Sequence, residues 1–82
     1  MTEFQRMRLI TTEVLRHLIR ANGPMSISDL RGKVGMDADD FEIREAAWRL
    51  VDYDAAQFTD DNKLVALKRN ARTFQREREA LR

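Results

Sequence analysis

Residues 36–50 read MDADDFEIREAAWRL, and this stretch decides the predicted fold because its apolar residues recur at helical spacing. One side of the resulting helix is expected to face the interior, and it carries Ile43, Ala46, Ala47, Leu50 and Val51. The opposite side carries two aromatic rings and two carboxylates, from Phe41, Glu45, Trp48 and Asp52. The pattern therefore predicts a helix that presents an acidic, aromatic face to its surroundings.

The same stretch carries signals for the start of a helix. We expect Asp37 to be the N-cap residue, with Asp40 supporting the first turn as in a capping box. Met36 and Phe41 would then occupy the two positions of a hydrophobic staple. Because acids in a first turn also oppose the helix macrodipole, part of the acidity of this segment serves the helix itself.

The chain before this stretch predicts a long helix over residues 3–22. Its apolar stripe is made by Phe4, Met7, Ile10, Thr11, Val14, Leu15, Leu18 and Ile19. Asn22-Gly23-Pro24 is a strong stop signal, and Gly23 is a natural residue just past a helix C-terminus.

A very short strand and a second helix are expected next. Ile27 lies between two serines, as in a short strand, and Ser28 is positioned to cap a helix. Leu30 and Val34 lie four apart on one face of that helix. Gly35 ends it and permits a sharp turn.

After the quoted stretch the apolar period changes to that of strands. Residues 56–59 and 64–67 are predicted to form a hairpin joined by Asp60-Asp61-Asn62-Lys63. Either Leu64 and Ala66, or Val65 and Leu67, would cover the core beside residues 56 and 58. Residues 68–82 lack Gly and Pro, so a final basic helix is expected over about 70–82.

This order of elements resembles the winged-helix family, a helix-turn-helix extended by a hairpin "wing". The residues that carry the resemblance, over about residues 9–69, are Val14, Leu15, Leu18, the ISDL of 27–30, Ile43, Ala47, Leu50 and the QFTDDNKLVAL of 57–67. The expected fold is a single domain over 1–82, mainly α with a small β-hairpin: a winged helix-turn-helix with an added C-terminal helix. Members often have an acidic residue and Gly where this chain has Tyr53-Asp54, so Asp54 is expected to take a positive φ.

Composition excludes several kinds of function. The chain has 82 residues, no cysteine and one histidine, His17, so neither a thiolate nucleophile nor a histidine metal pair can form. No Gly-rich phosphate loop and no catalytic set is recognisable, and the carboxylates Asp39, Asp40 and Glu42 spread around a helix rather than converge. We therefore expect no enzyme, no cofactor and no metal. The absence of a long apolar run and of a signal sequence favours a cytoplasmic protein without a membrane span.

Charge is distributed unevenly along a chain whose net charge is +1. Residues 1–36 hold six bases and three acids, residues 37–62 hold two bases and nine acids, and residues 63–82 hold seven bases and two acids. Such separation also serves solubility. The acidic middle nevertheless coincides with the helix that winged-helix proteins use to read DNA.

The resemblance implies binding to double-stranded DNA by a transcriptional regulator, with the third helix in the major groove and the wing along the minor groove. Matched position by position, the expected DNA contacts are Ser28, Arg31, Arg44, Arg49, Lys63, Lys68, Arg69 and Arg72. The acids of the third helix oppose a deep approach to phosphate.

The alternative is a protein-interaction module, a subunit or an antagonist of another protein. Its contacts would be Phe41, Glu45, Trp48 and Asp52, because an outward tryptophan is typical of a binding hot spot. The opposite reading, that Phe74 or Leu81 covers Trp48, stays open. A homodimer is also expected, through Phe4 and Met7 before the core and Phe74 and Leu81 after it, although the two end segments could instead pack within one chain.

Overall fold

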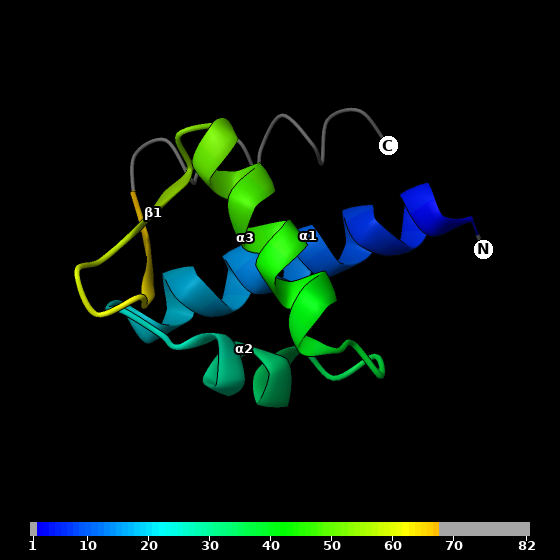
Figure 1. The fold of residues 1–82 in the computed structure, drawn as a ribbon, viewed down its shortest axis with the longest axis horizontal. Coiled ribbons are helices and arrows are strands. Elements are labelled where there is room, and N and C mark those ends of the chain that lie inside the picture. Colours follow the sequence, from blue (N-terminus) through cyan, green and yellow to red (C-terminus); the bar gives the residue numbers. More distant parts are fainter. Residues whose placement is uncertain (1, 68–82) are drawn as a thin grey trace.

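A computed structural model describes residues 2–67, and this part of the chain is mainly helical with one small antiparallel hairpin. Figure 1 shows α3 crossing in front of α1, with α2 below both and the hairpin at the left. The elements are α1 (Glu3–Ala21), α2 (Ile27–Val34), α3 (Asp40–Asp52), β1 (Ala56–Phe58) and β2 (Leu64–Ala66). The prediction of a mainly α fold with a small β-hairpin is confirmed, whereas the expected helix over 70–82 lies outside the described residues.

Helix α1 begins and ends with side chains that satisfy free backbone groups. The Thr2 hydroxyl accepts a hydrogen bond from the Gln5 N–H at 3.1 Å, and the Gln5 side chain accepts one from the Thr2 N–H at 3.0 Å. At the other end Asn22, not Gly23, takes the left-handed conformation, with φ 55°. The prediction of residues 3–22 is confirmed, and asparagine performs the capping because it tolerates positive φ.

Helix α2 starts earlier than the sequence suggested. Ser26 is the N-cap residue, and its hydroxyl accepts a hydrogen bond from the Asp29 N–H at 3.0 Å. The prediction of Ser28 as the cap is therefore wrong, and so is the short strand at Ile27, which is the first helical residue. The strand-like pairing lies at Met25, whose N–H and C=O both bond to Leu64 at 2.8 Å.

This difference leads to a matched pair of variants. Ser26→Ala removes the cap, so we expect the free energy of unfolding to fall by about 1 kcal/mol. Ser28→Ala changes an exposed hydroxyl inside the first turn and should leave stability nearly unchanged. Urea unfolding followed by circular dichroism compares the two. A larger decrease in the free energy of unfolding for Ser28→Ala than for Ser26→Ala would show that Ser28 is the N-cap residue.

Helix α3, in contrast, begins two residues later than the sequence suggested. Asp39 is the N-cap residue: its carboxylate accepts a hydrogen bond from the Glu42 N–H at 2.8 Å, and the Glu42 carboxylate accepts one from the Asp39 N–H at 3.3 Å. Asp37 cannot serve, because it sits in a turn at φ 52°. The predicted cap at Asp37, supported by Asp40, is wrong.

The predicted staple fails for the same reason. With Asp39 as the cap, the staple positions belong to Ala38 and Ile43, both of which are buried. Met36 and Phe41, predicted for these positions, are exposed. The two-residue shift turns Phe41 from a packing residue into a surface residue.

The core forms where α3 packs across α1. Ile43, Ala46, Ala47 and Leu50 are fully buried, as predicted, and Val51 is half-buried. They pack against the buried side of α1, which carries Ile10, Val14, Leu15 and Leu18. Helix α2 adds Leu30 and Val34, and the hairpin adds Ala56 and Leu64. Because this side of α3 is fixed in the core, the other side must face outward.

Backbone hydrogen bonds join the hairpin to the rest of the fold: Leu64 of β2 pairs with Met25, and the Ala55 N–H, just before β1, donates to the Leu50 C=O of α3 at 2.9 Å. The Thr59 N–H donates to the Lys63 C=O at 2.7 Å and closes the hairpin loop, in which Asn62 has φ 60°. The Leu67 N–H donates to the Ala55 C=O at 2.9 Å. Asp54 has φ 57°, as expected. Buried Leu64 and half-buried Ala66 lie in the inward register, which settles the two alternatives. None of the helices within residues 2–67 is long and apolar enough to cross a membrane.

Candidate functional site

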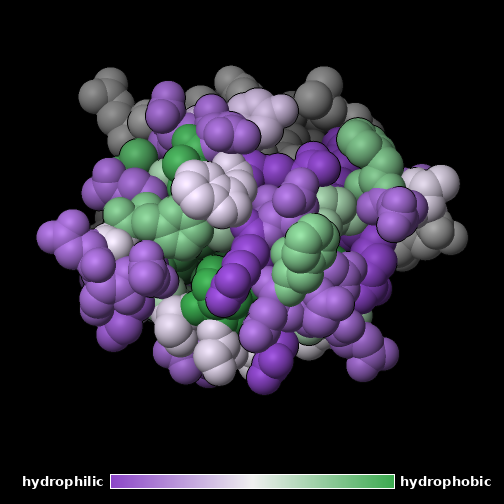
Figure 2. All heavy atoms as spheres, viewed as in Figure 1, coloured by the Kyte–Doolittle hydropathy of each residue, from purple (hydrophilic) through white to green (hydrophobic). Residues whose placement is uncertain are grey.

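The outer face of α3, made by Phe41, Glu45, Trp48 and Asp52, is open. All four residues are exposed, and Phe41 and Trp48 are 75% and 56% accessible. Over α3 and the hairpin, Figure 2 shows separate hydrophobic groups surrounded by hydrophilic ones. The predicted orientation of these residues is confirmed, whereas their role stays a prediction.

Trp48 has a partner that the sequence did not reveal. Its ring lies 5.0 Å from the Phe58 ring of β1, centroid to centroid, at an interplanar angle of 54°. Tilted pairs of this kind stabilise by about 1 kcal/mol. The hairpin therefore supports the indole from one side, while Trp48 remains an exposed residue. The signal in the sequence was Phe58, an aromatic residue in the predicted strand that follows α3 along the chain.

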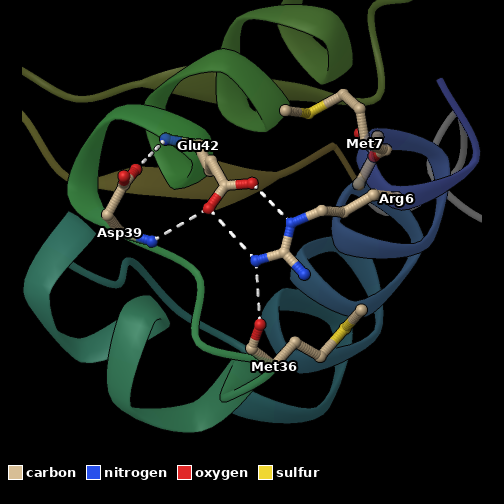
Figure 3. Close-up of polar contacts among 6 residues, drawn as sticks. Arg6, Met7, Met36, Asp39 and Glu42 are labelled. Atoms are coloured by element: carbon tan, nitrogen blue, oxygen red, sulfur yellow. Dashed lines mark hydrogen bonds and ion pairs between the residues drawn. The ribbon is translucent and has the colours of Figure 1, made fainter. Parts of the chain in front are cut away.

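The first turn of α3 is tied to α1 by an arginine. As Figure 3 shows, Arg6 Nε donates to Glu42 Oε2 at 2.8 Å, and one of its terminal nitrogens donates to Glu42 Oε1 at 3.2 Å and to the Met36 C=O at 2.9 Å. The two parallel contacts form the bidentate pair that guanidinium makes best with carboxylate. Sequence analysis missed this pair because its members lie 36 positions apart.

The pair shifts the pKa of both groups. Hydrogen bonding to Arg6 lowers the pKa of Glu42 below its ordinary value of 4.5, and Glu42 raises the pKa of Arg6. The folded state therefore holds the Glu42 proton less tightly than the unfolded state does. The stabilisation is complete above pH 4.5 and is lost as pH falls through the lowered pKa of the folded state.

Glu42→Gln tests this linkage. We expect stability at neutral pH to fall slightly, since both groups are partly solvated, and the loss of stability on acidification to become shallower than in the parent. Glutamine can still accept from the Asp39 N–H, so the capping box is retained. Urea unfolding at a series of acidic pH values measures both effects. Parallel pH profiles for variant and parent would exclude this pair as a source of acid sensitivity.

Three of the expected DNA contacts have carboxylates beside them. Arg31 lies 3.0 Å from Asp40, Arg49 lies 4.0 Å from Glu45, and Lys63 lies 3.7 Å from Asp61. All these side chains are exposed, so each pair is weak and can open. Together with Arg6, the two arginines offset three carboxylates of α3, whereas Lys63 lies beside a carboxylate of the hairpin loop.

The remaining predicted residues are spread over the molecule. Arg44 is exposed, and its side chain makes no hydrogen bond or ion pair with residues 2–67; Ser28 is exposed in the first turn of α2. Phe4 is 69% accessible, whereas Met7 packs against the core of its own chain. The other expected contacts lie outside the described residues: Lys68, Arg69, Arg72, Phe74 and Leu81.

Within residues 2–67, no group of three histidines or carboxylates is placed to hold a metal ion. His17 is half-buried on α1, with its Nε2 3.9 Å from a carboxylate oxygen of Glu13. The outer face of α3 is the candidate site on geometry and charge.

Comparison of the chain with protein-family models, with curated proteins and with solved structures finds no match in any of the three.

Proposed function

We propose that the protein is a small winged-helix DNA-binding protein that regulates transcription. The single observation that carries the proposal is that α3 turns a complete face outward beside a hairpin that is bonded to the helical part. A helix presented next to such a hairpin is the arrangement by which winged helices enter the major groove and reach along the minor groove.

Basic residues border the helix and the hairpin. Arg44 and Arg49 flank the outer face of α3, and Lys63 lies at the end of the hairpin loop. Residues 68–82, which follow directly, add six bases against two acids. Because Glu42 and Asp40 are already paired with Arg6 and Arg31, the first turn repels phosphate less than its composition suggests.

These positions favour a shallow approach to DNA. Glu45 and Asp52 lie in the middle of the outer face, where a deep dock would bring them toward phosphate. The basic residues lie at the edges of this face. Contacts with the DNA phosphates would therefore come from these edges and from the segment after β2. Such contacts position a protein on duplex DNA without reading its sequence.

A gel-shift assay on random duplex DNA at low salt tests the proposal. We expect retardation, and we expect replacement of Lys68 and Arg69 by glutamine to weaken it. Each neutralised phosphate contact should reduce the steepness of the salt dependence by about 1 on a log–log scale. Complete absence of retardation in the parent chain at low salt would contradict a DNA-binding function.

A protein-interaction module is the second candidate. The accessible side chains of Phe41 and Trp48 favour it, since exposed apolar groups mark interaction sites and tryptophan is enriched in protein-interface hot spots. It predicts that Trp48→Ala abolishes capture of a partner without unfolding the domain.

We also propose a homodimer. Of the predicted dimer contacts within residues 2–67, Phe4 is exposed at the start of α1, whereas Met7 packs against the core. Sedimentation of the parent and of Phe4→Ala tests this proposal. Monomeric parent protein at all concentrations would contradict it.

A further inference from the structure

We infer that the outer face of α3 is a docking surface for an arginine-bearing amphipathic segment of another protein, with an arginine lying over the Trp48 indole. The inference rests on the second candidate function and names the chemistry of its partner. It follows from the spacing of the two rings, from the charges between them and from the support under the indole.

The spacing of the rings suits an elongated partner. Phe41 and Trp48 lie seven positions apart on α3, which is about 10 Å along a helix. Both rings are on the same side, and Glu45 lies between them. A partner helix with apolar side chains two turns apart can contact both rings at once, in the way that amphipathic helices bind through repeated anchors.

The charges within this face are negative. Glu45 precedes Trp48 by three positions and Asp52 follows it by four, so both carboxylates are surface neighbours of the indole. A guanidinium over the indole would gain a cation–π contact and an ion pair together. The C-terminal end of α3 adds its own partial negative charge on this side. Acidic partners would instead meet two carboxylates at the centre of the surface.

The indole is ready to receive a cation. Phe58 supports one side of it at 5.0 Å, and no cation–π pair occupies it among residues 2–67. Asp52 makes no ion pair with those residues, while the Arg49 contact to Glu45 is 4.0 Å long and exposed at both ends. An incoming arginine therefore displaces little.

The test uses the full chain and a labelled synthetic helical peptide, with leucine at three- and four-residue spacing and arginine beside each leucine. Fluorescence anisotropy of the peptide measures Kd. We expect binding, a loss of about thirtyfold or more in Trp48→Ala, and a loss of about tenfold in the double variant Glu45→Gln, Asp52→Asn. Leu9→Ala, an exposed apolar residue on α1 that belongs to none of the proposed contacts, is the matched control and should bind as the parent does.

A second peptide with glutamate in place of every arginine separates the possible failures. Binding of both peptides with equal affinity would contradict the inference that the partner is basic, but it would still be consistent with a protein-interaction function. Binding of neither peptide would overturn the inference. A parent chain that sediments as a dimer, and becomes monomeric in Trp48→Ala but not in Phe4→Ala, would assign the surface to a second copy and also overturn the inference.

Discussion

Leu50→Ala should lower the free energy of unfolding by about 3 kcal/mol, because it leaves a cavity where α3 packs across α1. Leu50 is fully buried, and its neighbours on the same side of α3 are fixed in the core. A domain of this size has a stability of about 5 kcal/mol, so the variant should lose more than half of it. Urea unfolding followed by circular dichroism gives the measurement.

Trp48→Ala, two positions away, is the matched control. It removes the contact with Phe58 but little burial, so its cost should be about 1 kcal/mol. The ratio of the two losses reports which side of α3 faces the core. A larger loss in Trp48→Ala than in Leu50→Ala would reverse the orientation of the helix and remove both proposed functions.

DNA affinity should fall about a thousandfold between roughly 50 and 200 mM salt, if about six phosphates are contacted. The contacts would come from two bases that flank α3, one on the hairpin loop and three in the following segment: Arg44, Arg49, Lys63, Lys68, Arg69 and Arg72. Fluorescence anisotropy of a labelled duplex at several salt concentrations gives the slope.

Two variants check where the contacts lie. Arg44→Ala with Arg49→Ala should reduce the log–log slope by about 2, since two contacts are removed. Arg16→Ala, whose guanidinium pairs with Glu13 within α1, should leave the slope unchanged. Equal slopes in all three proteins would exclude α3 from the DNA contact.

Local periodicity predicted the described elements well. The inward side of α3, the stripe on α1 and the two strands all follow from apolar spacing, because burial on one face requires that spacing. These features depend on residues close together in the chain, so one sequence contains the information. The positive φ of Asp54 was expected as well, from the family resemblance rather than from periodicity.

The helix starts and the ion pairs were not predictable in the same way. Ser26 and Ser28 are both good N-cap residues, as are Asp37 and Asp39, so tertiary packing chooses between them. The chosen caps follow the Met25–Leu64 pairing and the run of positive φ from Gly35 to Asp37. The Arg6–Glu42 pair joins distant positions, and no local pattern announces it.

The exposure of Trp48 tests the central claim most directly, because it is the single tryptophan of the chain. The claim is that core packing of α3 turns its aromatic, acidic face outward and leaves it open. Quenching of the native fluorescence by acrylamide should then approach the efficiency seen in urea, with emission shifted to long wavelength. Short-wavelength emission that acrylamide quenches poorly in the native chain would contradict the claim, since the indole would be enclosed.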